Sequence, residues 1–290
     1  MSEIHFGTAG WSYPDWKGIV YPAPRERGFD ELGYLASYFG AVEINSTFYR
    51  PPEAKHAASW VRRTAGAEGF LFTLKLHRRF THERKERWSE GEAETFRRGI
   101  EPIVSSGRLG AVLLQFPWSF ANTEANRRWL ADLAGAFSSL PLVAELRQAG
   151  WLKEASLKFL ASLDIGFCNI DQPASSKSTG PTALITSKTG YVRFHGRNRK
   201  AWFDRNAGRD ERYDYLYDEE ELREWAPRIR RVADRAEKTF VIGNNHFKGQ
   251  APANILQLKK ILTGERVKAP PSLLEAFPML EAWTGGGGEG

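Results

Sequence analysis

Charged and amide side chains recur in pairs, two residues apart, at the ends of short apolar runs. The pairs are Glu43 with Asn45, Lys75 with His77, Glu145 with Arg147, Arg193 with His195, and Asn244 with His246. Residues two apart in an extended strand lie on the same face, so each pair is expected to project together. Carboxylates and imidazoles could exchange protons with a substrate, while Arg, Lys and Asn could hold an anion.

Eight strand-like runs must position these side chains. They are Ile4–Gly10, Ala41–Thr47, Leu71–His77, Ala111–Pro117, Leu142–Arg147, Ile165–Asp171, Tyr191–Asn198 and Thr239–Asn245. Helical patterns separate most of them, at Phe29–Phe39, 51–66, up to Ser105, Asn122–Phe137, Lys153–Leu163, Asp218–Glu237 and Pro252–Leu262. The segments 78–88, 172–188 and 198–217 are expected to be loops. Strands alternating with helices predict a parallel sheet.

The number of strands and the absence of a linker predict an α/β fold, a (β/α)8 TIM barrel, as a single domain over residues 1–284. The Gly-rich tail, 285–290, is expected to be disordered. An open doubly wound sheet is the alternative, but Gly7 to Gly10 lacks the glycine spacing of a phosphate-binding turn.

Composition limits the function. The chain has 290 residues, of which 41% are hydrophobic, and a formal charge of +6, which permits an anionic partner without requiring one. Cys168 is the only cysteine, which excludes an intramolecular disulfide and a thiolate zinc cluster. No leader pattern or membrane-length apolar run is apparent, so a cytoplasmic location and no membrane partner are expected. The sequence does not indicate an oligomeric state.

Several motifs together resemble the YecE-like family, also called domain of unknown function 72. They are Gly10-Trp11-Ser12-Tyr13, Glu43-Ile44-Asn45-Ser46-Thr47-Phe48-Tyr49, Lys75 with Thr81-His82, Leu114-Gln115-Phe116-Pro117, Arg193-Phe194-His195-Gly196 and Asn244-Asn245. The resemblance spans about the first 260 residues. It implies a TIM barrel related to sugar-isomerase-like and endonuclease-like barrels, without an established reaction. Where the family often has Arg-His-x-Ser-Trp, this chain has Arg147-Gln148-Ala149-Gly150-Trp151.

Our leading hypothesis is an enzyme with a cationic pocket for a phosphorylated or other anionic substrate at the carboxyl ends of the strands. Its catalytic residues would be Glu43, Glu145 and His195. Its substrate-binding residues would be Lys75, His77, Gln115, Arg147, Arg193, Arg197, Asn244, Asn245 and Trp11. The cations among them outnumber the carboxylates, and this surplus suits an anion. No cofactor is predicted, and the reaction could be hydrolysis or isomerisation. Replacing Arg193 should abolish ligand binding and leave the melting temperature largely intact.

Four alternatives stay open. The charges could form a structural ion-pair plug. A divalent metal could bind Glu145, Asp171, His195 and His246, as in isomerase-like or endonuclease-like barrels. Glu43 and Glu145 could be the two carboxylates of a glycosidase, with aromatic rings at the mouth stacking on sugars. The loops Arg78–Arg87 and Arg197–Arg212 could bind nucleic acid without catalysis.

Overall fold

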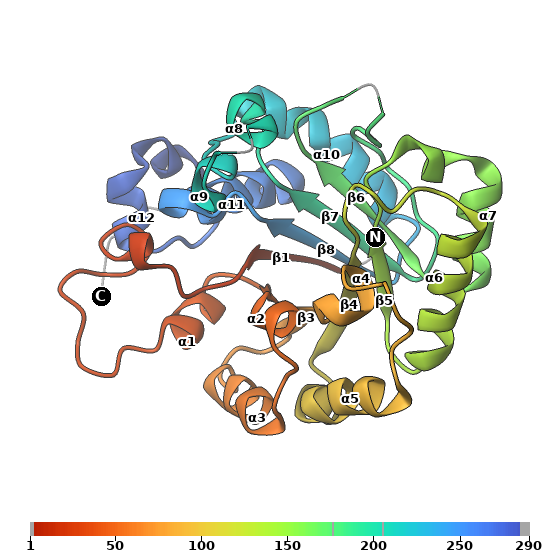
Figure 1. Ribbon diagram of the computed structural model, residues 1–290. Helices are drawn as coiled ribbons and strands as arrows, with labels where there is room; N and C mark the ends of the chain where they lie inside the picture. The colour runs from red at the N-terminus through yellow and green to blue at the C-terminus, as the bar shows by residue number, and fades with distance from the viewer. Residues whose placement is uncertain (1–2, 176, 205, 285–290) are drawn as a thin grey trace.

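Eight parallel strands close into a barrel in the computed structural model, which describes residues 3–284 except 176 and 205 (Figure 1). The strands are β1 (Glu3–Ala9), β2 (Ala41–Ile44), β3 (Leu71–Lys75), β4 (Leu109–Gln115), β5 (Leu142–Glu145), β6 (Gly166–Asp171), β7 (Thr189–Phe194) and β8 (Lys238–Gly243). Each strand pairs with its neighbours in sequence, and β1 pairs with β8. The predicted (β/α)8 barrel is therefore confirmed. The tail, 285–290, lies outside the described residues.

Side chains of one parity fill the interior of the barrel. These inward residues are apolar over most of its length, and they are Ala9, Ala41, Leu71, Ala111, Leu113, Val143, Cys168, Ile170, Tyr191, Phe240 and Ile242. Residues of the other parity pack outward against the helices, as Val192 and Phe194 do on β7. By the period-two rule, the next inward positions follow two residues later. On β2, β5, β7 and β8 these positions are Glu43, Glu145, Arg193 and Asn244, which are all polar.

Helices surround the barrel (Figure 1). The α-helices are α1 (Glu31–Ala36), α2 (Ser46–Tyr49), α3 (Ala54–Arg63), α4 (Arg78–Thr81), α5 (Glu90–Ser105), α6 (Glu124–Ala136), α7 (Glu154–Ser162), α8 (Arg199–Phe203), α9 (Arg209–Arg212), α10 (Glu219–Ala233), α11 (Gln250–Thr263) and α12 (Pro271–Ala276). Four short 3-10 helices accompany them in this part of the chain, at Pro14–Trp16, Ala149–Leu152, Phe247–Gly249 and Pro278–Trp283. None of the helices within the described ranges is long and apolar enough to cross a membrane.

Local sequence sets where the longer helices begin and end. Ser89 and Asp218 each accept a hydrogen bond from a backbone N–H of the first turn of α5 and α10, and a glutamate three residues later completes a capping box. Gly264, with φ at +73°, ends α11, because glycine adopts this left-handed conformation without steric cost.

The structure departs from the predicted elements mainly in the loops. Strand β2 ends at Ile44 instead of Thr47, and α2 begins at Ser46. The expected loops 78–88 and 198–217 contain α4, α8 and α9, and α12 follows the last predicted helix. These helices are four to six residues long, too short for a helical period to stand out in the sequence.

Candidate functional site

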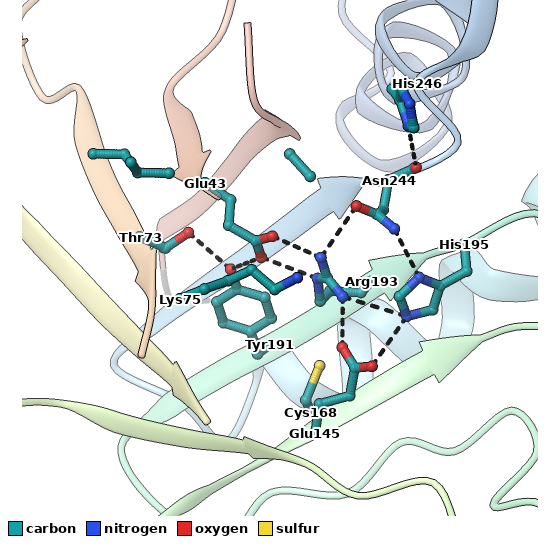
Figure 2. A network of polar contacts seen from close by, with 12 residues as sticks. Glu43, Thr73, Lys75, Glu145, Cys168, Tyr191, Arg193, His195, Asn244 and His246 are labelled. Atoms are coloured by element: carbon teal, nitrogen blue, oxygen red, sulfur yellow. Dashed lines mark hydrogen bonds and ion pairs between the residues drawn. The ribbon is translucent and has the colours of Figure 1, made fainter. Parts of the chain in front are cut away.

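Arg193, on β7, is the centre of a polar layer at the carboxyl ends of the strands (Figure 2). Its Nε and Nη2 donate to the carboxylate of Glu43 at 2.9 and 2.6 Å, and its Nη1 donates to Glu145 at 2.5 Å. All three side chains are completely buried. The pairing of both carboxylates with one guanidinium offsets the cost of burying these groups. The sequence prediction that these residues meet inside the barrel is confirmed.

Glu145 joins this centre to Arg147. The Nε and Nη2 of Arg147 both donate to Oε1 of Glu145, at 3.0 and 2.7 Å. Burial by itself would raise the pKa of Glu145, but the charges of Arg193 and Arg147 outweigh burial and place that pKa well below its usual value. Glu145 is therefore a carboxylate at neutral pH and a weak base.

His195 lies beside this carboxylate as a neutral imidazole. Burial lowers its pKa to about 4, although the charge of Glu145 acts in the opposite direction. Arg193 donates to Oδ1 of Asn244 at 3.2 Å, so the amide nitrogen of Asn244 is the donor to Nδ1 of His195, at 2.9 Å. The proton of the neutral ring then sits on Nε2, which lies 3.4 Å from Glu145. The rings of Trp202 and Tyr213 cover His195, with centroids at 5.8 and 6.3 Å.

Lys75, at the end of β3, carries the charge that this layer leaves over. Within the described ranges its ammonium has no hydrogen-bond or ion-pair partner, and it lies 5.1 Å from the centre of the Phe48 ring. Burial and then the nearby charge of Arg193 lower the pKa of Lys75 to about 8. Arg193 and Arg147 already balance Glu43 and Glu145, so Lys75 is the surplus cation of the layer.

A cavity of about 370 Å³ opens above Lys75 at the mouth of the barrel. Its lining residues are Gly10, Trp11, Ser12, Tyr13, Asn45, Ser46, Tyr49, Lys75, Tyr213, Asn244 and His246. We call this the lysine cavity. Oδ1 of Asn45 is buried without a hydrogen-bond partner in the part of the chain that the structure describes. The lysine cavity therefore offers one cation and several hydroxyl groups, and one of its lining residues, Asn45, holds a buried unpaired acceptor.

A second cavity, of about 330 Å³, lies next to Arg147. Its lining residues are Trp118, Arg147, Gln172, Pro173, Ser175, Ser178, Trp202 and Phe203. We call this the tryptophan cavity. The rings of Trp202 and Tyr213 are in contact, with centroids 5.9 Å apart, and each lines a different cavity.

Asp171 and Arg197 do not join the site, contrary to the prediction. Cys168 and Ile170 of β6 point inward, so Asp171 points outward by the period-two rule. There it accepts hydrogen bonds from Arg197, at 2.7 to 3.2 Å, and from Tyr217 and Trp225. The cationic surplus inferred from the sequence is therefore smaller by one, since Arg197 is paired outside the barrel.

His77 and Asn245 are also turned away from both cavities. Nδ1 of His77 accepts a hydrogen bond from the backbone N–H of Arg79 at the start of α4. The amide of Asn245 donates to the carbonyl of Tyr215 and to Asn254, each at 2.9 Å, and so holds the loop before α10. Local turn and loop contacts use both side chains, and neither residue lines a cavity, so their predicted contact with a substrate stays a prediction.

Of the other predicted residues, Trp11, Lys75, Asn244 and His246 line the lysine cavity and Arg147 lines the tryptophan cavity. Oε1 of Gln115 is buried and has no hydrogen-bond partner among the residues described. Glu43, Glu145, Arg193 and His195 form the polar layer and line neither cavity.

Tyr213 is a lining residue that the sequence did not single out. It precedes α10 in a segment expected to be an irregular loop, and no periodicity points to it. The aromatic content of that segment was the available signal.

The four alternative metal ligands are not brought together, because Asp171 lies outside the barrel. Across residues 3–284, leaving out 176 and 205, no group of three or more His, Cys, Asp or Glu side chains could hold a metal ion. In the basic segment proposed for nucleic acid, Arg78 pairs with Glu83 at 2.7 Å and Arg79 with Glu92 at 2.8 Å.

Comparison with known proteins places the chain in a family. The model of the family described as "Protein of unknown function DUF72" matches residues 5–276. UPF0759 protein YunF of Bacillus subtilis is 29% identical over 287 residues, which are 94% of this chain and 100% of that protein.

Two solved structures of DUF72 family proteins are similar to this chain over most of their lengths. The one from Thermotoga maritima is 35% identical with a TM-score of 0.78, and the match covers 90% of this chain and 99% of that one. The one from Enterococcus faecalis is 25% identical with a TM-score of 0.78, and the match covers 92% and 98%. The sequence-based resemblance is thus confirmed, and the chain belongs to the DUF72 family, proteins with a TIM-barrel fold and no assigned function.

Proposed function

We propose that this protein is an enzyme that takes a small anionic, hydroxyl-bearing substrate into the lysine cavity and performs acid–base chemistry on it. The observation that carries the proposal is the surplus cation. Lys75 faces the cavity without a carboxylate partner in the described part of the chain, and an anion there would restore the balance of charge. A carboxylate or phosphate group of the substrate is the anion that an ammonium of this kind binds.

The substrate's hydroxyl groups are inferred from the remaining lining. Oδ1 of Asn45 is buried and has no donor among the residues described, and rotation of this lining side chain toward the cavity would pair it with an O–H of the substrate. Ser12 and Ser46 add hydroxyls at the same cavity. These groups match a sugar acid, a sugar phosphate or another hydroxylated acid.

Lys75 is also the best candidate for moving a proton. A group whose pKa is about 8 holds both protonation states in useful amounts near neutral pH. Glu43, Glu145 and His195, which the sequence suggested as acid and base, lie beneath the cavity lining. In this proposal Glu43 and Glu145 fix Arg193, and His195 fixes Asn244, so they act as positioning residues.

Binding of defined probes tests the proposal. Saturation-transfer NMR with galacturonic acid and glucose 6-phosphate, against neutral glucose, should detect the anions on the native chain. Lys75→Met should reduce their affinity at least about tenfold, the effect of losing one charge-assisted contact. Arg128→Met is the matched control, because Arg128 is an exposed cation on α6, paired with Glu124.

Equal binding of glucose and the two anions, or unchanged anion binding by Lys75→Met, would contradict the proposal. Incubation of the bound probes with the protein, followed by NMR, tests turnover. Binding without turnover of any probe would replace the enzyme with a binding protein. The expected cytoplasmic location and the nucleic-acid alternative stay predictions.

A further inference from the structure

The tryptophan cavity has no role in the function proposed above. It lies at the same end of the barrel as the lysine cavity, between the segment after β4, the end of β5 and α8. Its volume of about 330 Å³ is at the lower end of the range of small-ligand pockets, which begins at about 300 Å³.

Aromatic faces form two sides of this cavity. Trp118 is 40% exposed and Phe203 is 54% exposed, which is unusual for side chains of this size. Three neighbours hold Trp202 in place. Its ring contacts His195 and Tyr213, and the guanidinium of Arg147 lies 5.7 Å from its centre. The cavity thus presents one fixed ring and two rings open to solvent.

The polar edge of the cavity supplies one donor and one acceptor. Arg147 uses Nε and Nη2 on Glu145, and its Nη1 has no partner within the described ranges. Oε1 of Gln172 is buried and likewise unpaired there. A buried acceptor without a donor is unfavourable, and rotation of the Gln172 side chain toward the cavity would pair it with a ligand O–H or N–H.

Backbone hydrogen bonds hold the segment around Arg147 against the loop that follows β6. The backbone N–H of Thr179 donates to the carbonyl of Arg147 at 3.1 Å, and that of Ala149 donates to the carbonyl of Lys177 at 2.9 Å. These contacts join the loop after β6 to the end of β5. The backbone that carries the donor, Arg147, is therefore held by this pairing.

We propose that the tryptophan cavity is a second subsite, which takes the ring of a sugar whose neighbouring ring carries an acid group in the lysine cavity. This inference rests on the proposed function and narrows its substrate class to anionic sugars of at least two rings. A sugar ring has apolar C–H faces and hydroxyl edges. The faces fit Trp118 and Trp202, and the hydroxyls both donate to Gln172 and accept from Arg147.

Other ring compounds fit these groups less well. A flat aromatic acid without a hydroxyl or N–H group would stack on the same rings and bind Arg147, but it has no donor for Oε1 of Gln172. An aliphatic chain would cover the aromatic faces and leave both polar groups unpaired. The rings of Trp202 and Tyr213, one from the lining of each cavity, lie 5.9 Å apart between their centroids, so linked sugar rings have a short distance to cross.

Paired probes with one and two rings test the second subsite by calorimetry on the full chain. Digalacturonic acid should bind at least about tenfold tighter than galacturonic acid, as expected for one additional stacked ring. Trehalose 6-phosphate against glucose 6-phosphate repeats the comparison with phosphate as the acid. A gain in only one pair identifies the acid group that the substrate carries.

Variants show which residues produce the higher affinity for the two-ring probe. Trp118→Ala should remove most of the advantage of the two-ring probe and leave one-ring binding unchanged, and Gln172→Met should act in the same direction. Tyr49→Ala is the control, because Tyr49 lines the lysine cavity and is 60% exposed, and it should weaken both probes. Circular dichroism checks that each variant is folded.

Two results would overturn the second subsite: no gain for either two-ring probe, or a gain that Trp118→Ala leaves intact. Failure of the proposed function gives a different result, namely one-ring binding that Lys75→Met does not change. The two proposals are therefore separately falsifiable.

Discussion

Two clusters of buried charge lie at the same end of the barrel, one inside the strands and one outside. Inside, Arg193 of β7 binds Glu43 and Glu145. Outside, Asp171 of β6 binds Arg197 and accepts further hydrogen bonds from Tyr217 and Trp225. Both clusters are built from a strand-end carboxylate and an arginine, and the sequence pattern does not distinguish them.

They differ in what lies next to them. Each oxygen of Asp171 accepts at least two hydrogen bonds, and neither Asp171 nor Arg197 lines the lysine or the tryptophan cavity. Lys75 and Arg147, which lie next to the inner cluster, line the lysine and the tryptophan cavity, and in the part of the chain that the structure describes the Lys75 ammonium and Nη1 of Arg147 have no hydrogen-bond partner. Ion pairs at a barrel mouth therefore indicate a site only where charge or hydrogen-bonding capacity is left over.

The largest effect is expected from Arg193→Met. The variant removes the cation that Glu43 and Glu145 share, so two buried carboxylates lose their main partner. Such a loss costs about 3 to 5 kcal/mol of the free energy of unfolding, measured by urea denaturation. The sequence alone predicts a largely intact melting temperature for this variant, but the contacts of Arg193 predict a large loss of stability. A change below about 1 kcal/mol, as expected for exposed pairs, would show that the inner cluster does not support the fold.

Asp171→Asn should destabilise the protein by about 2 to 3 kcal/mol, because Arg197 loses its ion pair and the donors around Asp171 lose a charged acceptor. The expected loss is smaller than for Arg193, since Arg197 is 26% exposed and also pairs with Glu221. Anion binding in the saturation-transfer assay should not change. A clear loss of binding in folded protein would place the outer cluster in the site and end the distinction drawn above.

Lys75 provides a pH-dependent test of the inner cluster. Its pKa is about 8 in the folded protein and about 10.5 when unfolded. Burial and Arg193 disfavour the charged form, so this cost is fully present below pH 8 and disappears as the pH rises toward 10.5. The stability of the native chain relative to Lys75→Met should therefore increase over this interval. Urea denaturation at several pH values measures it, and a constant difference would contradict the lowered pKa.

Anion affinity should change in the opposite direction, falling above pH 8 as the ammonium of Lys75 loses its proton. A bound anion favours the charged form, which moves the fall to somewhat higher pH. Titration of galacturonic acid between pH 7 and 10 gives the profile. Arg128→Met should show the same fall, and Lys75→Met should show none.

Much of the inner cluster could be predicted from the sequence because it follows from strand periodicity alone. Glu43, Glu145 and Arg193 alternate with apolar residues, and closure of the barrel brings their strands together. The same rule, applied to β6, would have turned Asp171 outward, since Cys168 and Ile170 precede it at inward positions. The outward position of Asp171 is therefore readable from the sequence.

The wall between the cavities could not be predicted in this way. Trp202 and Tyr213 lie in aperiodic chain, and tertiary contacts place them. One is the side-chain amide of Asn198, which donates to the carbonyls of Glu211 and Asp214 at 3.0 and 3.2 Å and draws the two ends of the segment together. Such pairings between loop residues leave no pattern in the sequence.

A matched pair of tyrosines gives the smallest expected effect and the sharpest comparison. The hydroxyl of Tyr191 donates to Glu43 at 2.9 Å in the inner cluster, and that of Tyr217 donates to Asp171 at 2.8 Å in the outer one. Both rings are buried, so Tyr191→Phe and Tyr217→Phe each remove a hydrogen bond to a buried carboxylate and a second one, to Thr73 and to the backbone N–H of Gly196 respectively, without changing the packing. Each should cost about 1 to 3 kcal/mol by urea denaturation.

The two variants should differ in their effect on ligands. Glu43 positions Arg193, whose charge lowers the pKa of Lys75, so loss of the Tyr191 hydroxyl should alter anion affinity slightly, by less than about threefold. Tyr217→Phe should leave affinity unchanged, because the Asp171 carboxylate that it contacts pairs with Arg197 outside the barrel and Asp171 does not line the lysine cavity. An equal change of anion affinity in the two variants would contradict this distinction. It would mean that the outer cluster influences the lysine cavity as strongly as the inner cluster does.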